Sequence, residues 1–165
     1  MQISFQWTDS GDPVFQRFYL KTEEYYNQLV GGESNRKAFI PLNASGSIAD
    51  VLIAFDGKTA AGCAGLKRYS SKDMEVKRVW VEPSYRGNHI ARRMMELLER
   101  KALEKGYSRM ILQTRAAMTV AVGLYEKLGY RLIPNYPPYD RLEGAVCFAK
   151  DLQPVSLRMQ RRPSV

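Results

Sequence analysis

The sequence predicts one α/β or α+β domain built around a single mixed sheet, and three observations lead to this fold class. The chain has 165 residues, a length that fits one domain with a substantial core. Its residues are 45% hydrophobic and 25% charged, the ordinary balance of a globular protein. Segments of strand and helix periodicity follow in the order strand, helix, three strands, helix, strand, helix, two strands. Because no repeat or linker interrupts this order, we expect one domain over residues 1–152.

The first elements are a short strand and a long helix. Apolar residues alternate in QISFQW (2–7), which predicts a strand. Asp12 is a suitable helix N-cap, and Pro13 fits the first helical position. Aromatic and apolar residues then recur at helical spacing over 15–29, and the glycine pair that begins at Gly31 predicts the helix end.

A hairpin and its preceding loop come next. Residues 33–49 are polar and predict a loop that has room for a short helix. The apolar runs 50–55 and 59–69 flank Asp56 and Gly57, a typical hairpin turn pair, so we expect two antiparallel strands here.

The second half of the chain supplies the remaining elements. Apolar and branched residues predict strands over 74–83 and 109–114. The stretch 89–104 has a continuous apolar stripe and predicts an amphipathic helix. A shorter helix over 117–129 and a strand over 130–134 are expected to follow.

A loop rich in proline and tyrosine, 135–144, and a last strand, 145–152, complete the domain. We expect the tail 153–165 to be disordered, because it has little apolar content. The net charge is +8, to which three tail arginines contribute. The remaining +5 is compatible with a phosphate-rich cofactor and too mild to require nucleic acid, and no RNP-like or helix-turn-helix signature is present.

The composition argues against several other classes. Cys63 and Cys147 have no CxxC neighbour and the chain has one histidine, so we expect two reduced core thiols and no metal site. No stretch approaches the roughly 18 apolar residues of a membrane span. The N-terminus lacks the basic and apolar regions of a secretory signal, which favours a cytoplasmic protein.

The turn before the helix 89–104 has the features of an anion site. A helix N-terminus offers free N–H groups and the positive end of the helix dipole. Gly87 lets the backbone approach an oxygen atom, and Arg86 adds charged donors. The turn is neither a GxxxxGK[ST] nor a GxGxxG motif. An ordinary strand-to-helix turn with a basic solvent face remains the alternative.

Two motifs in this order resemble the GNAT superfamily of acyl-CoA N-acyltransferases. The family's Gln/Arg-x-x-Gly-x-Gly/Ala phosphate motif corresponds to RGNHIA (86–91), and its second signature corresponds to LYEKLGY (124–130). The resemblance extends over residues 1–152. It implies a mostly antiparallel sheet with splayed middle strands and flanking helices, and acetyl-CoA as cosubstrate.

The resemblance also implies a cofactor site. Its expected pyrophosphate ligands are the backbone amides of Arg86, Gly87, Asn88, His89, Ile90, Ala91 and Arg92. The strand backbone at Val79, Trp80 and Val81 is expected to pair with the pantetheine arm, which would enter a gap beside the strand 109–114.

Two residues depart from the family pattern. His89 occupies a glycine position, where we expect it to supply its amide from helical dihedrals. A catalytic base and a core or capping residue are the alternatives for His89. Met118 stands where many relatives have an asparagine that faces CoA, so one side-chain contact is expected to be missing.

Two residues are candidates for proton transfer. The resemblance implies that Tyr125 protonates the CoA sulfur, the alternative being an aromatic residue on the inner helix face. Glu75 is the candidate base, through water. It lies four residues before Val79, which predicts the same strand face. A carboxylate paired with Lys77 or Arg68 is the alternative for Glu75.

We expect the acceptor site between the first helix with its following loop and the loop 135–144. Its candidate lining residues are Tyr25, Tyr26, Tyr136, Tyr139 and Arg141. Tyrosines can stack on an amine or form hydrogen bonds with it. Exposed loop aromatics and a solvated arginine are the alternative.

Together these features predict an N-acetyltransferase that moves an acetyl group from acetyl-CoA directly to a primary amine of a small molecule or a protein. Neither a membrane nor nucleic acid is an expected partner, and the protein is expected to be a monomer or a homodimer. A catalytically weak acyl-CoA sensor and a nucleic-acid-binding domain are the rival hypotheses. The sensor would not need Tyr125 or Glu75.

Overall fold

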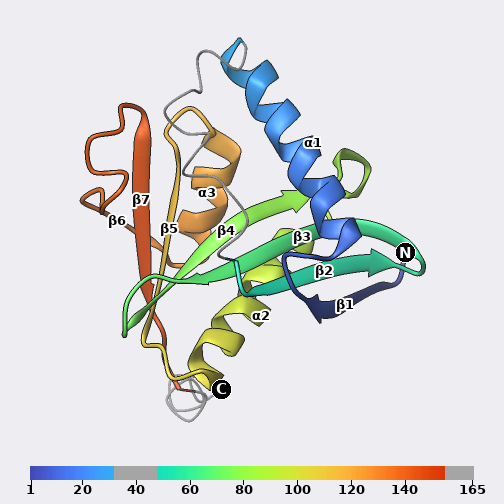
Figure 1. Ribbon diagram of the computed structural model, residues 1–165, viewed down its shortest axis with the longest axis horizontal. Helices are drawn as coiled ribbons and strands as arrows, with labels where there is room; N and C mark the ends of the chain where they lie inside the picture. The colour runs from blue at the N-terminus through green and yellow to red at the C-terminus, as the bar shows by residue number, and fades with distance from the viewer. Residues whose placement is uncertain (32–47, 155–165) are drawn as a thin grey trace, which may run out of the picture.

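A seven-stranded sheet forms the centre of the protein, in a computed structural model that describes residues 1–31 and 48–154 (Figure 1). The strand order is β1-β2-β3-β4-β5-β7-β6. Neighbouring strands are antiparallel except for β4 and β5. The strands are β1 (Ile3–Thr8), β2 (Asp50–Asp56), β3 (Thr59–Arg68), β4 (Asp73–Val81), β5 (Arg109–Arg115), β6 (Arg131–Ile133) and β7 (Ala145–Asp151). The helices are α1 (Pro13–Val30), the 3-10 turn η3 (Pro83–Tyr85), α2 (Ile90–Glu104) and α3 (Thr119–Lys127).

The helices cover the two faces of the sheet. Helix α1 packs Phe15 and Phe18 on one face, together with Ile53 and Trp80. Helices α2 and α3 pack on the opposite face, where the larger buried cluster lies. The predicted fold class, with helices on both sides of a mixed and mostly antiparallel sheet, is therefore confirmed.

Local signals fixed the ends of several elements. The Asp12 side chain accepts a hydrogen bond from the Val14 amide at 2.8 Å, and Gly31 ends α1 in the left-handed conformation at φ 81°. Gly57 has φ 58° in the β2–β3 turn. These caps and turns confirm the sequence predictions, although the predicted loop lies outside the described residues over 33–47.

Strand β4 contains a β-bulge that the sequence pattern did not reveal. Cys63 of β3 is opposite Trp80, but Gly65 is already opposite Lys77, so two residues of β4 lie opposite one of β3. Arg78 takes the extra position with φ 55°. A bulge of this kind changes which face the following side chains occupy.

The bulge corrects the predicted position of Glu75. Val76 belongs to the cluster under α2, and Val79 packs against that same cluster. Trp80 lies in the α1 cluster on the opposite side. Glu75 alternates with Val76 and therefore faces the α1 side. The expectation that Glu75 and Val79 share a face was wrong, because the extra residue shifts the alternation by one.

Strands β4 and β5 pair only at their beginnings. Their ladder covers Asp73–Glu75 and Arg109–Ile111, and no further pair forms between them. Beyond that point β5 continues to pair with β7, and β4 with β3. The predicted splay of the two middle strands is thus confirmed. The Arg109 guanidinium holds the paired end through two bonds to the Asp73 carboxylate, at 2.7 and 3.0 Å.

The close approach of β3 to the bulged strand leads to a stability prediction. A Cβ atom at Gly62 would lie 2.5 Å from the Trp80 carbonyl oxygen, so Gly62→Ala must displace backbone. We expect a loss of about 1–3 kcal/mol in the free energy of unfolding, measured by urea titration. Gly123→Ala on α3 is the control: its Cβ would meet no atom within 4 Å, and a helical alanine should be neutral or stabilising. Equal effects of the two substitutions would contradict the proposed clash.

The Asp73–Arg109 ion pair joins β4 and β5 where they begin, and it predicts that the free energy of unfolding depends on pH. The hydrogen bonds from Arg109 lower the pKa of Asp73 below its ordinary 3.8. Because the folded pKa is depressed, this stabilisation is present above pH 3.8 and is lost as the pH falls through the folded pKa. We expect Asp73→Asn to reduce the free energy of unfolding by about 1 kcal/mol near neutral pH and by progressively less in acid, measured by urea titration.

Asp151→Asn is the matched control for this experiment. The Arg131–Asp151 pair is exposed on both sides, and such pairs contribute little. A loss with Asp73→Asn that stays constant down to strongly acid pH would contradict the role of the carboxylate charge.

Candidate active site

The turn between η3 and α2 is exposed, but the Arg86 N–H, a predicted pyrophosphate ligand, already donates to the Pro83 carbonyl at 3.3 Å. Two side chains of the turn donate to nearby backbone carbonyls. Asn88 Nδ2 donates to the Tyr85 oxygen at 3.0 Å, and Arg86 Nε donates to the oxygen of Val81, the last residue of β4, at 2.9 Å. Gly87, with φ 81°, has open space where a Cβ would be. The backbone at this turn is therefore ordered and accessible.

The start of α2 leaves its first amides without intrahelical partners. The first backbone bond of the helix runs from the Arg93 N–H to the His89 carbonyl at 3.0 Å. The N–H groups of Ile90, Ala91 and Arg92 precede that ladder and lie at the positive end of the helix dipole. An anion placed at the turn would meet these donors together.

The structure corrects the expectation for His89. This residue is the N-cap of α2 and has φ 60°, in the left-handed region, and not the helical dihedrals that we expected. Glycine reaches this conformation without cost, which explains why glycine is usual at the position. The His89 side chain is exposed and makes no capping hydrogen bond, while its amide stays at the turn.

The strand that leads to the turn offers an unpaired edge. After Glu75, β4 has no β5 partner among the described residues, so no strand pairs with the backbone from Val76 to Val81 on that edge, where the Val81 carbonyl accepts from Arg86 Nε. An extended chain with amide groups can add to such an edge by main-chain hydrogen bonds. The Trp80 ring packs away from it, against Tyr25 at 5.5 Å between ring centres.

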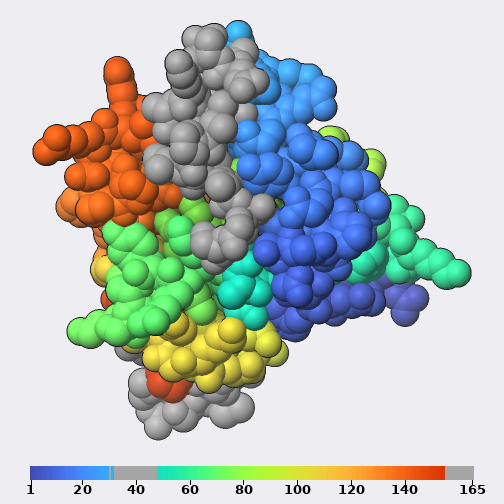
Figure 2. All heavy atoms as spheres, viewed as in Figure 1, coloured from blue at the N-terminus to red at the C-terminus, as the bar shows by residue number. Residues whose placement is uncertain are grey.

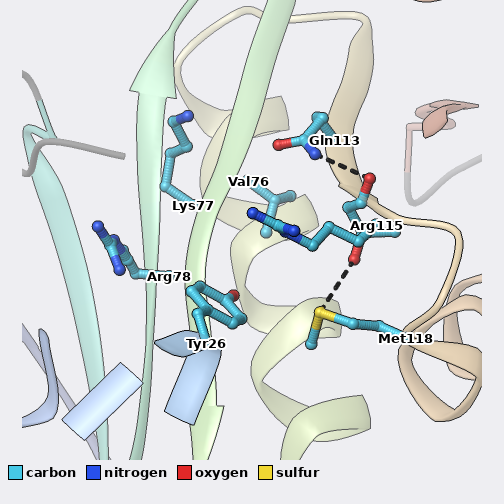
Figure 3. Close-up of a pocket in the computed structure, with 8 residues that line it drawn as sticks. Tyr26, Val76, Lys77, Arg78, Gln113, Arg115 and Met118 are labelled. Carbon is cyan, nitrogen blue, oxygen red and sulfur yellow. Dashed lines mark hydrogen bonds between the residues drawn. The ribbon is translucent and has the colours of Figure 1, made fainter. Parts of the chain in front are cut away.

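A solvent-open hollow lies where β4 and β5 part (Figure 3). Its volume is about 60 Å³. Helix α1 contributes Tyr26, and the N-cap of α3 contributes Met118. The remaining lining residues are Val76, Lys77 and Arg78 of β4 and Gln113, Thr114 and Arg115 of β5. The Met118 sulfur accepts a hydrogen bond from Thr114 Oγ1 at 3.8 Å, so it occupies polar space beside the gap.

The gap beside β5 was predicted, but the β5 side chains that reach it were not among the predicted site residues. Gln113, Thr114 and Arg115 lie in the part of β5 that no longer pairs with β4. Their polar character at the end of an apolar strand was the one available signal, because the sequence does not show where two strands separate.

Tyr125 is buried near the C-terminal end of α3. Its side chain is 7% exposed and packs with the rings of Tyr130 and Phe148, at 6.0 and 6.5 Å between centres. Burial raises the pKa of Tyr125, with a smaller contribution from Tyr26. The phenol is therefore neutral at physiological pH and able to donate a proton or a hydrogen bond.

Glu75 lies in a buried polar cluster. Its side chain is 3% exposed, and the Tyr136 hydroxyl donates to Oε2 at 2.6 Å. Lys77 Nζ lies 3.6 Å from Oε1 and also donates to the Tyr139 hydroxyl. The pairing with Lys77 that the sequence offered as an alternative is thus present.

This cluster shifts the pKa values of its members in opposite directions. Burial, followed by the Glu75 charge, raises the pKa of Tyr136 and of Tyr139. Burial lowers the pKa of Lys77, and the Glu75 charge opposes that change. The cluster therefore keeps its phenols protonated and makes its ammonium group easier to deprotonate.

The predicted acceptor residues divide into separate groups. Tyr26 reaches the hollow, whereas Tyr136 and Tyr139 contact the Glu75 cluster, and Tyr139 is only 1% exposed. Tyr25 packs on Trp80, and Arg141 is exposed on the loop after β6. Helix α1 and that loop flank the same face of the molecule (Figure 2).

Three other expectations concern metals, thiols and membranes. Within residues 1–31 and 48–154, no group of three or more His, Cys, Asp or Glu side chains could hold a metal ion. Cys63 and Cys147 are free and buried, which confirms them as core thiols. Over the same part of the chain, no helix has the length and apolar character needed to cross a bilayer.

Known proteins resemble this chain in both sequence and fold. The acetyltransferase (GNAT) family profile matches residues 12–130. An IAA acetyltransferase from Azospirillum brasilense is 30% identical over 118 residues, which cover 71% of this chain and 76% of the relative.

Solved structures agree on the fold. A putative acyl-CoA N-acyltransferase from Klebsiella pneumoniae has a TM-score of 0.75 at 19% identity, with 92% of this chain and 99% of the other covered. A PaiA N-acetyltransferase from Thermoplasma acidophilum in complex with coenzyme A has a TM-score of 0.70 at 18% identity, with the same coverage. The accessible amides ahead of α2, the parted strands and these matches show together that the chain belongs to the GNAT acetyltransferase family and is an acyl-CoA-dependent N-acyltransferase.

Proposed function

We propose that the protein transfers the acetyl group of acetyl-CoA directly to a primary amine of a small molecule or a protein. The observation that carries this proposal is the continuous path from the turn at Gly87 along the unpaired edge of β4 to the hollow. The turn offers amides for a diphosphate, and the β4 edge offers hydrogen bonds for an amide-containing arm. The thioester would then lie between β4 and β5.

Direct transfer needs suitably placed donors; Tyr125 does not line the hollow, but it is close enough to Tyr26, which does, for Tyr26 to affect its pKa. The amine nitrogen attacks the thioester carbonyl carbon, the carbon–sulfur bond breaks, and the sulfur takes a proton. Backbone amides near Val79 are suitable donors to the carbonyl oxygen. Tyr125, neutral because it is buried, is the proposed proton donor to sulfur.

Glu75 is the proposed acceptor of the amine proton. It is too buried to meet the amine directly, so Tyr136 or a water molecule would relay the proton. Lys77 Nζ, 3.6 Å from Oε1, gives this buried carboxylate a charged partner. No covalent nucleophile is needed for direct transfer.

Titration calorimetry with acetyl-CoA tests the binding proposal. We expect heat of binding and a higher melting temperature with the ligand, because a ligand that binds only the folded state stabilises it. An acceptor screen with acetyl-CoA, monitored by release of free thiol, tests turnover. The absence of binding would overturn the proposed function, whereas binding without turnover on any amine would favour the acyl-CoA sensor.

Replacement of Tyr125 tests its role as the acid. We expect Tyr125→Phe to lower kcat by about a hundredfold or more, because the thiolate would leave unprotonated. Acetyl-CoA affinity should stay within about threefold, since the ring still packs in the core. Both are measured by thiol release and calorimetry.

Tyr130→Phe is the matched control, because its phenol lies in the same core and its hydroxyl has no hydrogen-bond partner among the described residues. We expect that control to keep its kcat. An unchanged kcat in Tyr125→Phe would remove the proposed role of Tyr125.

The left-handed conformation of His89 leads to a prediction that distinguishes the role of its backbone amide from that of its imidazole ring. His89→Gly should raise the free energy of unfolding by up to about 1 kcal/mol, because glycine adopts φ 60° without strain. Acetyl-CoA affinity and kcat should be maintained, since the amide remains. Urea titration, calorimetry and thiol release provide the three measurements.

His89→Ala serves as the comparison, because it removes the ring but keeps the Cβ and its strain. We expect no gain in stability from this variant. A large loss of kcat in both variants would show that the imidazole takes part in the reaction.

A further inference from the structure

The peptide bond between Arg78 and Val79 lies in the bulge of β4, where two residues of this strand lie opposite one residue of β3. Arg78 has φ 55°, a conformation that costs free energy in a residue other than glycine. A peptide at such a position can rotate about its flanking bonds and exchange the directions of its C=O and N–H groups. Contacts from outside β4 therefore decide its orientation.

Cys63 of β3 holds the carbonyl group of this peptide. Its Sγ donates a hydrogen bond to the Arg78 carbonyl oxygen at 3.4 Å, within the protein interior. Cys63 is 1% exposed, and burial raises the pKa of its thiol, so the S–H group keeps its proton. A thiol is a weak donor, but a hydrogen bond in the interior is electrostatically stronger than the same bond in water.

Helix α1 holds the side chain of the same bulge residue. Arg78 Nη2 donates to Glu23 Oε1 at 2.7 Å, and the guanidinium lies over the Tyr19 ring, 4.1 Å from its centre. Arg78 is therefore attached to β3 through its carbonyl oxygen and to α1 through its side chain. Together these contacts oppose rotation of the peptide that follows.

The direction of the Arg78 carbonyl sets the direction of the Val79 amide. Within residues 1–31 and 48–154, the one cis peptide joins Pro137 and Pro138, so the Arg78–Val79 peptide is trans. The C=O and N–H groups of a planar trans peptide point in opposite directions. Because Cys63 holds the carbonyl, the Val79 N–H points away from that thiol. The proposed thioester position, between β4 and β5, lies across β4 from β3.

We propose that Cys63 is a positioning residue of the reaction, whose thiol keeps the Arg78–Val79 peptide in the orientation that presents the Val79 amide to the thioester carbonyl oxygen. This inference rests on the proposed N-acetyltransferase function. Negative charge develops on that oxygen as the amine attacks, and a donor that is already oriented stabilises the charge without reorganisation. A reversed peptide would present the Arg78 carbonyl oxygen instead, which repels the developing charge.

The infrared spectrum of bound acetyl-CoA tests this role without an amine acceptor. Acetyl-CoA that is isotope-labelled at the thioester carbonyl carbon gives a C=O stretching band that is isolated as a difference from the unlabelled complex. A hydrogen bond to the carbonyl oxygen weakens the C=O bond and lowers this frequency. We expect the band at a higher frequency in Cys63→Ala and Cys63→Val than in the parent protein, and at the parent frequency in Cys63→Ser.

These three replacements separate the hydrogen bond from packing. Cys63→Ser keeps a donor, Cys63→Ala removes it, and Cys63→Val fills the site without one. We expect kcat, measured by thiol release with the best amine of the acceptor screen, to fall about tenfold or more in the alanine and valine variants and to stay within about threefold in the serine variant. Acetyl-CoA affinity should stay within about threefold in all three, because the diphosphate is proposed to bind at the start of α2.

Ile53→Val is the packing control. Ile53 of β2 lies opposite Cys63 in the cluster under α1 and is 2% exposed. Its replacement removes a methylene group and no hydrogen-bonding group, so we expect a lower melting temperature with an unchanged kcat and C=O band. Burial of a hydroxyl should also make Cys63→Ser no more stable than Cys63→Ala, so stability alone would not give serine the higher kcat.

The outcomes distinguish the positioning role from the proposed function. An unchanged kcat and C=O band in folded Cys63→Ala and Cys63→Val would overturn the role of Cys63 and leave the N-acetyltransferase function in place. Equal losses in the serine and alanine variants would also overturn it, because packing would then be responsible. If acetyl-CoA binds and no amine is acetylated, the proposed function fails, and the infrared comparison still supports or overturns orientation by Cys63. No binding of acetyl-CoA would overturn both.

Discussion

The separation of β4 from β5 is the constraint on which the rest of the structure depends. Two neighbouring strands in a sheet ordinarily satisfy each other's backbone groups, yet here the ladder stops after Glu75 and Ile111. Beyond Glu75, β4 pairs only with β3, and beyond Ile111, β5 pairs only with β7. The gap between them is at once the hollow and the access route for an extended ligand arm.

The bulge at Arg78 and the Asp73–Arg109 pair act on either side of this separation. The ion pair joins the two strands at their beginning, where the parallel ladder exists. The bulge follows the ladder, bends β4 and sends Trp80 to the α1 face while Val79 faces α2. A positive φ at a non-glycine residue is uncommon and costs free energy, so the surrounding contacts of Arg78 with Tyr19 and Glu23 must stabilise it.

The buried cluster around Glu75 contributes to packing and also contains the group proposed to accept the amine proton. A carboxylate that is 3% exposed requires partners, and Tyr136 and Lys77 provide them. The same contacts connect β4 to the loop after β6, so the cluster also positions that loop beside the hollow. Glu75 therefore has a structural role in this cluster, in addition to the role proposed for it in proton transfer.

The sequence by itself determined the local structure: the Asp12 cap, the Gly31 helix end, the hairpin, the order of elements and the turn that precedes α2. These features depend on residues within a few positions of one another, where dihedral preferences and periodicity act directly. The family resemblance added the expectation of parted strands, which the β4–β5 ladder confirmed.

Only the tertiary structure decided the face of Glu75, the left-handed conformation of His89 and the entry of β5 side chains into the hollow. The Tyr136–Glu75 bond joins residues 61 positions apart, and the bulge at Arg78 arises from pairing with β3. Such features depend on which backbone groups meet across the sheet. Alternation along one strand does not reveal them, because a single inserted residue exchanges the two faces.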